Sequence, residues 1–248
     1  MGEAPRRPRI LIPARFSASA SALRYRAEVA SRNLVEAVYA AGGEPLVIHP
    51  HAPGGRVDDA EVAARLELGD GVLLPGGGDL AGHWTGQEAH PALYDVDDEQ
   101  DAFDLAVARS CLDRGVAMLA ICRGLQVVNA ARGGTVVQDM DESYGDMRHH
   151  RHRRHAIAVD EGSILSGAVG DRTEASCFHH QCLARLGAGM EVVARSEEGV
   201  IEAVEIPAAR GWFLGVQWHP EDTWSDDPQQ LRLFRALVDA ARHAGAPA

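Results

Sequence analysis

The stretch VAMLAICRGLQ, residues 116–126, marks a change from one periodicity to another. The apolar run that ends at Ile121 predicts a buried strand, whereas Leu125–Arg132 repeats its apolar residues with the period of a helix. Cys122 lies between them, where a strand turns sharply into a helix. A buried strand followed at once by a helix is typical of a parallel α/β unit.

The rest of the chain repeats this alternation. Its first half predicts strands over residues 9–12, 45–48, 71–74 and 116–121, and helices over residues 25–41, 57–68, 97–114 and 125–132. After Gly133 the sequence predicts strands over residues 156–159, 191–195, 200–206 and 212–217, and a closing helix over residues 229–242. We therefore expect a single α/β domain over residues 1–248. Its mostly parallel central sheet would have helices on both faces and extra antiparallel strands in the C-terminal half.

Composition excludes several classes of function. The formal net charge of −12 argues against a nucleic acid or an anionic membrane as partner. All 24 basic residues are arginine, which excludes a lysine Schiff base, a pyridoxal phosphate anchor and a P-loop. The four cysteines, in a chain of 248 residues, do not suggest a disulfide framework.

The sequence also lacks the marks of a membrane or secreted protein. No window approaches the roughly 20 apolar residues of a membrane span. The apolar run Ile10–Pro13 is too short for a secretory signal. We expect a cytoplasmic protein.

Cys122 is a candidate nucleophile because of its place in the turn. A thiolate at a helix N-terminus is stabilised by the helix dipole. Ala120 and Gly124 on either side are small enough to let a tight turn close, and the Arg123 backbone N–H would face an oxyanion formed beside the sulfur. At this point a buried core thiol is an equally open interpretation.

The stretch FLGVQWHPE, residues 213–221, offers a base for this thiol. An apolar strand ends near His219, and Glu221 follows two residues later. Residues i and i+2 of an extended segment face the same way, so the carboxylate would accept the imidazole Nδ1–H and orient the other nitrogen toward Cys122. Taken alone, the stretch would equally fit a solvated His-Pro-Glu turn.

A glycine-rich loop follows the third predicted strand. In PGGGD, residues 75–79, the glycines let backbone amides face a ligand, so this loop is a candidate for a second oxyanion donor. The loop also fits the G-x-G-x-x-A dinucleotide fingerprint, but the following AGHWTGQEAHP does not predict the helix that this fingerprint requires.

Together, AICRGLQ, PGGGD and GVQWHPE resemble the class I glutamine amidotransferase superfamily, and within it the γ-glutamyl-γ-aminobutyrate hydrolases, which cleave γ-glutamylated amines. The resemblance covers nearly the whole chain. It implies a flavodoxin-like fold with a catalytic triad of Cys122, His219 and Glu221. It also implies oxyanion amides from Arg123 and the Gly76–Gly77 region, and pocket residues Gln126, His179 and Gln181.

The resemblance implies an activity and leaves alternatives open. The implied enzyme cleaves a γ-glutamyl amide to glutamate and free amine through a thioester, without a cofactor, acting on a small molecule in a pathway such as polyamine catabolism. A glutaminase subunit that supplies ammonia to a separate synthetase, and a catalytically idle binding relative, are the alternatives. A homodimer is left open. Two departures concern the substrate: the family's Asn-Ser pair is Ser176-Cys177 here, and an Arg-Asp pair before the long helix is Gln100-Asp101.

Two stretches raise the question of a metal site. HHRHRRH, residues 149–155, interleaves its histidines with arginines that would repel a cation. The family resemblance implies a histidine that opens a strand at His155, and so a pocket-rim or structural role for this residue. CFHHQC, residues 177–182, spaces its ligands too tightly for a zinc site. We predict no metal at either stretch.

Overall fold

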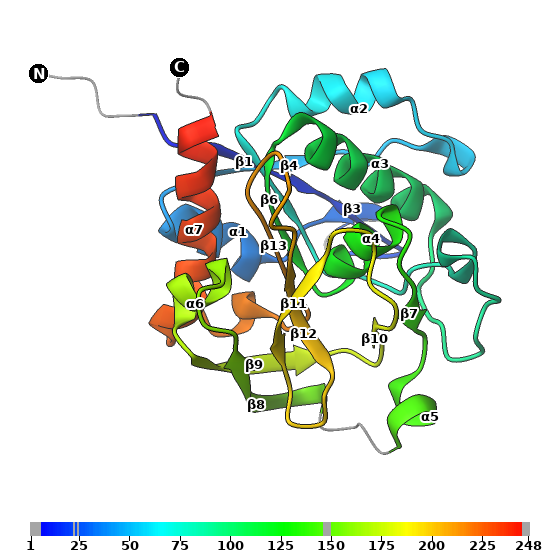
Figure 1. Ribbon diagram of the computed structural model, residues 1–248. Helices are drawn as coiled ribbons and strands as arrows, with labels where there is room; N and C mark the ends of the chain where they lie inside the picture. Colours follow the sequence, from blue (N-terminus) through cyan, green and yellow to red (C-terminus); the bar gives the residue numbers. More distant parts are fainter. Residues whose placement is uncertain (1–5, 22, 24, 146–149, 245–248) are drawn as a thin grey trace, which may run out of the picture.

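The computed structural model describes residues 6–21, 23, 25–145 and 150–244. A nine-stranded sheet crosses the molecule in the order β4-β1-β5-β6-β13-β12-β11-β8-β9 (Figure 1). The strands from β4 to β13 are parallel, and those from β13 to β9 pair antiparallel. Their bounds are β1 Arg9–Pro13, β4 Glu44–Ile48, β5 Gly71–Leu74, β6 Ala117–Ile121, β8 Arg151–Val159, β9 Arg172–Phe178, β11 Glu191–Arg195, β12 Ile201–Glu205 and β13 Phe213–Val216. The predicted α/β class and sheet type are confirmed.

Helices cover both faces of the parallel part. Their bounds are α1 Arg32–Ala40, α2 Asp59–Leu66, α3 Asp98–Arg114, α4 Arg123–Ala131, α5 Met140–Tyr144, α6 Ile164–Val169 and α7 Pro228–Ala244. Side chains of α1, α6 and α7 pack into one buried cluster, and those of α2, α3 and α4 pack into a second cluster on the opposite face. Strand residues alternate between the two clusters, as Leu119 and Ala120 of β6 do, because successive side chains of a strand point to opposite faces.

The start of the first predicted helix is wrong. Residues 27–29 form strand β3 (Ala27–Val29), which pairs antiparallel with β2 (Arg15–Ser17), and α1 begins only at Arg32. This pairing joins segments that are separated along the chain, so the local periodicity over 25–41 does not reveal it. The glycine end of the helix is confirmed: Gly42 has a φ of +96°, which favours glycine.

The second half contains elements that the apolar pattern did not indicate. Residues 151–155 continue the predicted strand as the start of β8, which pairs with the unpredicted β9. Two short strands, β7 (Val136–Val137) and β10 (Cys182–Leu183), form a separate antiparallel pair. Among the described residues, no helix is both long and apolar enough to span a bilayer.

Candidate active site

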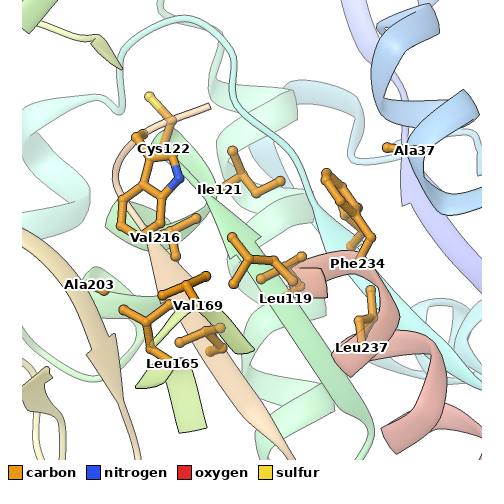
Figure 2. Close-up of a cluster of buried hydrophobic side chains, with 14 of the residues drawn as sticks. Ala37, Leu119, Ile121, Cys122, Leu165, Val169, Ala203, Val216, Phe234 and Leu237 are labelled. Carbon is orange, nitrogen blue, oxygen red and sulfur yellow. The ribbon is translucent and has the colours of Figure 1, made fainter. Parts of the chain in front are cut away.

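Cys122 occupies a strained turn between β6 and α4. Its φ of 51° and ψ of −111° lie in a region that L-residues rarely adopt, and such strain costs about 1–3 kcal/mol. Among the described non-glycine residues, it shares a positive φ only with Asp95. Figure 2 shows Cys122 at the edge of the buried cluster, with its sulfur pointing away from that cluster. The turn therefore directs the sulfur away from the buried cluster instead of packing it there.

Close packing explains the glycine that follows. A Cβ built on Gly124 would lie 2.2 Å from the carbonyl oxygen of Leu74, at the end of β5. Only glycine allows α4 to start this close to the sheet, as the prediction of small residues around the turn requires.

The sheet register delivers His219 to the same place. Strands β6 and β13 are parallel neighbours, with Val216 opposite Ile121. The Cys122 backbone amide donates to the Val216 carbonyl at 2.7 Å. The next side chain, Gln217, donates from Nε2 to the Cys122 sulfur at 3.5 Å. Gln217 lies in the motif quoted above but was not singled out as a site residue.

His219 lies between Cys122 and Glu221. Its Nδ1 is 2.8 Å from Glu221 Oε1, so the predicted contact is present. The expected extended segment is wrong, because Pro220–Asp222 form a 3-10 helix that turns Glu221 back toward the imidazole. A Cβ built on Gly76 would lie 2.9 Å from His219 Cε1 and 3.6 Å from the Cys122 Cβ, so both side chains contact the same glycine. Burial disfavours the imidazolium, but the charges of Glu221 and Cys122 and hydrogen bonds to both outweigh it, and the pKa of His219 is raised well above its usual value.

Arg15 fixes the glycine loop from behind. Its guanidinium donates to the carbonyls of Pro75 at 2.5 Å and Gly76 at 2.6 Å. A trans peptide places its N–H opposite its C=O, so these bonds turn the amides of Gly76 and Gly77 away from Arg15. No sequence motif indicates this role for Arg15.

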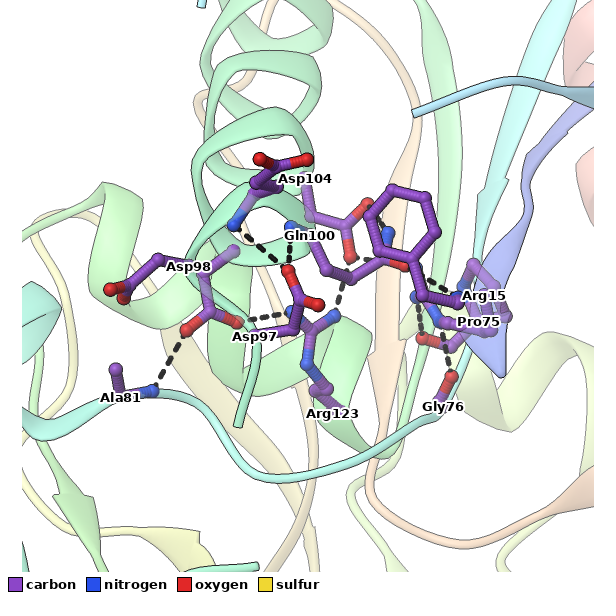
Figure 3. Close-up of polar contacts among 12 residues, drawn as sticks. Arg15, Pro75, Gly76, Ala81, Asp97, Asp98, Gln100, Asp104 and Arg123 are labelled. Atoms are coloured by element: carbon purple, nitrogen blue, oxygen red, sulfur yellow. Dashed lines mark hydrogen bonds and ion pairs between the residues drawn. The ribbon is translucent and has the colours of Figure 1, made fainter. Parts of the chain in front are cut away.

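The Arg123 side chain has a separate, buried role. It forms ion pairs with Asp104 and, at 2.5 Å, with Asp101, both on α3; Arg15 also pairs with Asp104 at 2.8 Å (Figure 3). Burial opposes the charge on Arg123, but the two carboxylates outweigh this effect and raise its pKa. This network ties the Cys122 turn to α3 and to the glycine loop.

The Gln100-Asp101 pair belongs to the same region. The pair lies in the first turn of α3, where Asp101 also accepts a hydrogen bond from the Ala81 amide at 2.9 Å. Gln100 accepts from the Phe16 amide at 3.2 Å. The pair therefore anchors β2 and the loop after β5 to α3.

The residues predicted to bind substrate surround Cys122. Gln126, His179 and Gln181 line a cavity of about 20 Å³ together with Cys122 and Arg123. Gln126 donates to Gln217 at 3.3 Å, and Gln181 donates to the Gln138 carbonyl at 3.3 Å. The structure thus brings all three next to the sulfur.

A larger cavity adjoins the small one. It has a volume of about 960 Å³ and shares Gly77, Gly78, Asp79 and Arg123 with the cavity beside Cys122. Its lining carries seven acidic side chains (Glu28, Asp79, Asp95, Asp97, Asp98, Glu99 and Asp101) and three arginines (Arg15, Arg26 and Arg123). A third cavity, of about 280 Å³, reaches His219 and Glu221 from the other side of the loop.

His179 and Glu202 are buried next to each other with opposite protonation preferences. Burial lowers the pKa of His179 to about 4, so this ring is neutral at pH 7. Burial alone would raise the pKa of Glu202, but the neighbouring imidazoles of His150 and His155 outweigh it and lower that pKa to about 2. Glu202 is therefore an ionised carboxylate inside the protein. Of the histidine-rich stretch, His149 lies outside the described residues.

Comparison with known proteins places this site in a family. The model of the peptidase C26 family matches residues 10–221, which include Cys122, His219 and Glu221. The chain belongs to the peptidase C26 family. This membership confirms the sequence resemblance to class I glutamine amidotransferases.

The relatives carry two kinds of name. A Mycobacterium tuberculosis protein named "Putative glutamine amidotransferase Rv2859c" is 37% identical over 210 residues, covering 83% of this chain and 65% of that protein. The γ-glutamyl-γ-aminobutyrate hydrolase of Escherichia coli K12 is 28% identical over 222 residues, covering 84% of this chain and 85% of that protein. Both match most of this chain, but the match spans less than two thirds of the mycobacterial protein.

The fold comparison agrees with the family. A Thermoplasma acidophilum structure titled "putative gmp synthase subunit a protein" superposes with a TM-score of 0.65 at 14% identity, covering 97% of this chain and 96% of that one. At this identity the likeness shows the fold alone.

Proposed function

We propose that this chain is a cysteine-dependent hydrolase that cleaves the γ-glutamyl amide of a γ-glutamylated amine to glutamate and the free amine. The observation that carries the proposal is the meeting of Cys122 and His219 against Gly76, with Glu221 bonded to the far side of the imidazole. A nucleophile, a base and an orienting carboxylate in this order form a catalytic triad.

The chemistry follows from the positions of these groups. His219 accepts the thiol proton, and the Cys122 sulfur attacks the γ-carbonyl to form a tetrahedral oxyanion. The backbone amides of Arg123 and the Gly76–Gly77 region would stabilise this oxyanion. The oxyanion collapses to a thioester as His219 gives its proton to the leaving amine. Water, deprotonated by His219, then attacks the thioester, which releases glutamate and regenerates the thiol.

The large cavity suggests what kind of amine leaves. It adjoins the Cys122 cavity through the glycine loop, so the amine part of the substrate would extend into it. Seven acidic side chains against three arginines in its lining favour an amine that carries a second positive charge. A polyamine conjugate such as γ-glutamylputrescine fits this charge better than γ-glutamyl-γ-aminobutyrate, whose distal group is a carboxylate.

The test is release of glutamate by the isolated full chain from γ-glutamylputrescine, γ-glutamyl-γ-aminobutyrate and glutamine, with Cys122→Ala as the control. We expect turnover of a γ-glutamyl amine without any added protein, and a higher kcat/KM for the putrescine conjugate. If the chain hydrolyses none of the three substrates, the proposal is wrong.

One observation favours a second candidate. The relative that is 37% identical is named as a glutamine amidotransferase, which points to glutamine as the amide donor. In that case the chain would be a glutaminase that feeds ammonia to a separate synthetase. The same assay separates the two: preference for glutamine, or activity only after a synthetase is added, supports the glutaminase.

A further inference from the structure

Four side chains with metal-ligating atoms meet on the sheet beside the Cys122 cavity. His150 immediately precedes β8, Cys177 belongs to β9, His179 directly follows β9, and Glu202 lies in β12. One ligand atom from each lies within 4.8 Å of all the others. All four side chains are at most 5% exposed, so this cluster is interior and differs from an ordinary group of charges on a surface.

The hydrogen bonding of His179 leaves a lone pair facing this cluster. Its Nδ1 lies 2.9 Å from the carbonyl oxygen of Gln181. A carbonyl only accepts, so Nδ1 carries the hydrogen and Nε2 of the neutral ring is an acceptor. Within the described part of the chain, Nε2 has no hydrogen-bond partner, and it lies 3.9 Å from Glu202 Oε1. Two acceptors thus face each other without a donor between them.

The Glu202 carboxylate also lacks hydrogen-bond partners in the part of the chain that the structure describes. Neither carboxylate oxygen has a hydrogen-bond partner among the described residues, although the side chain is fully buried. The nearest imidazole nitrogens, on His150 and His155, lie 3.4 and 3.5 Å from Oε1, beyond the usual hydrogen-bond length of about 2.7–3.2 Å. These two imidazoles compensate the charge of Glu202 without a well-formed hydrogen bond, so a bound metal ion would satisfy the buried carboxylate better.

We propose that His150, Cys177, His179 and Glu202 bind a divalent transition metal ion, with Zn²⁺ as the best fit. Imidazole nitrogen, thiolate sulfur and carboxylate oxygen are the ligands of zinc sites. The thiolate disfavours Mg²⁺ and Ca²⁺, which prefer oxygen ligands. The charges of one thiolate and one carboxylate cancel the charge of the ion, so the buried site becomes neutral on binding.

The geometry requires only a small contraction. Ligand atoms around a tetrahedral Zn²⁺ lie about 3.3–3.8 Å apart, given metal–ligand bonds of about 2.0–2.3 Å. The observed limit of 4.8 Å therefore shortens by roughly 1 Å, within the reach of side-chain rotation. The Cys177 S–H bond breaks as the sulfur–metal bond forms, and the proton leaves to solvent. The Gln181 carbonyl on His179 Nδ1 is the outer contact that orients a ligating imidazole.

The composition of the proposed site shows why neither histidine-containing stretch predicts it. Each stretch supplies only part of the ligand set, and Glu202 joins them from a strand far along the chain. The arginines of the first stretch do not oppose the cation, because Arg151 and Arg153 are exposed while His150 is buried.

The site is adjacent to the proposed triad without sharing a residue with it. The Ser176 carbonyl, next to Cys177, accepts the His219 backbone N–H at 2.8 Å. His179 also lines the cavity beside Cys122. A bound metal would therefore rigidify the end of β9 and the pocket wall, and we expect it to raise the melting temperature.

The experiment uses Co²⁺ as a spectroscopic probe and the full chain carrying Cys122→Ala. This substitution removes the sulfur of the triad, which could itself hold a metal with His219. We expect one equivalent of Co²⁺ to give a thiolate-to-cobalt charge-transfer band and the intense visible bands of tetrahedral cobalt. Competition with Zn²⁺ should abolish both signals.

Two further variants decide the location. Adding Cys177→Ser should remove the charge-transfer band and weaken Zn²⁺ binding by at least about tenfold. Adding Cys111→Ala, which removes another buried thiol from α3, should leave both unchanged. Serine differs from cysteine only by oxygen in place of sulfur, so the first variant should fold, as circular dichroism would verify. Glu202→Gln, of equal size, gives an independent readout through the same loss of affinity. No stoichiometric binding, or a charge-transfer band that survives Cys177→Ser, would overturn the proposal.

Discussion

The amide of Cys122 donates a 2.7 Å hydrogen bond to the carbonyl of Val216, three residues before His219. This bond extends the parallel ladder of β6 and β13 by one step into the turn at Cys122. The relative position of sulfur and imidazole is therefore set by backbone pairing between two central strands. A mobile loop would leave this geometry much less defined.

Thiol reactivity should single out Cys122. Burial raises the pKa of both Cys111 and Cys182 to about 12, so these thiols are protonated and inert at neutral pH. Cys122 is paired with His219 and its sulfur points out of the core. We expect iodoacetamide to label Cys122 at least about tenfold faster than Cys111, as measured by peptide mass spectrometry. Equal labelling of the two would favour the catalytically idle relative.

The strain at Cys122 should appear in stability. Glycine tolerates a φ of 51° and a ψ of −111°, whereas alanine does not. Cys122→Gly and Cys122→Ala both lack the sulfur and should lose activity by roughly 10⁴-fold or more. Cys122→Gly should nevertheless have the larger free energy of unfolding, by about 1 kcal/mol, after the greater flexibility of its unfolded chain is allowed for. Urea denaturation of the two variants measures this difference.

The pH dependence should report on His219. Its pKa in the folded protein is raised, so the imidazolium that protonates the leaving amine persists at neutral pH and is lost only as pH rises through that higher value. Activity should fall on the alkaline side for this reason. In Glu221→Gln the carboxylate charge that raises this pKa is gone, so the alkaline limb should move to lower pH. An unmoved limb in the pH–rate profile would contradict the assigned role of Glu221.

Arg15 should act as a positioning residue for the glycine loop. Arg15→Met removes the donors that hold the Pro75 and Gly76 carbonyls, so the loop amides lose their fixed direction. We expect kcat to fall roughly 10- to 1000-fold, with a smaller change in KM. The upper limit of this range is the loss of kcat that follows removal of one oxyanion donor. Arg7→Met is the matched control, because Arg7 likewise bonds two backbone carbonyls, far from the site along the chain. It should keep wild-type kcat.

Gly76 should not tolerate a side chain. The Cβ of Gly76→Ala would lie 2.9 Å from His219 Cε1, so the imidazole has to move away from the sulfur. We expect at least a hundredfold loss of kcat/KM, because misplacement by about 1 Å has that effect. Gly167→Ala in α6, where a Cβ meets nothing within 4 Å, should leave activity unchanged and is the control. Normal activity in Gly76→Ala would contradict the described contact.

Local patterns predicted the fold wherever one segment determines its own structure. The run Gly71–Leu74 is a strand with the predicted bounds, since its four residues are buried on both faces. The capped helix α3 likewise begins after Asp97 and ends before Gly115, as its acidic start and glycine stop indicate. The β2–β3 hairpin was missed because its stability comes from pairing, which local periodicity does not record.

In the candidate site, too, local motifs predict some features, whereas others depend on segments that are distant along the chain. Cys122 directly follows β6, and His219 and Glu221 lie three and five residues after the end of β13, so their motifs indicated that these side chains meet at the ends of neighbouring strands. The role of the Arg123 side chain depends on its carboxylate partners in α3, which lie outside the motif around Cys122. One local signal could have helped: Asp101 and Asp104, at i and i+3, share one side of α3 beside its apolar residues. In the structure both are buried, and buried carboxylates need a cation. Nothing local could have joined Glu202 to His150 and His179.

The position of β13 between β6 and β12 has a consequence for biosynthesis. The strand that carries the thiol ends at residue 121, whereas the imidazole arrives only with residue 219 of 248. A growing polypeptide therefore holds the Cys122 thiol without its proposed proton acceptor until His219 has been synthesised. We expect nascent chains to be inert, so that the enzyme first becomes competent when the centre of its sheet is filled.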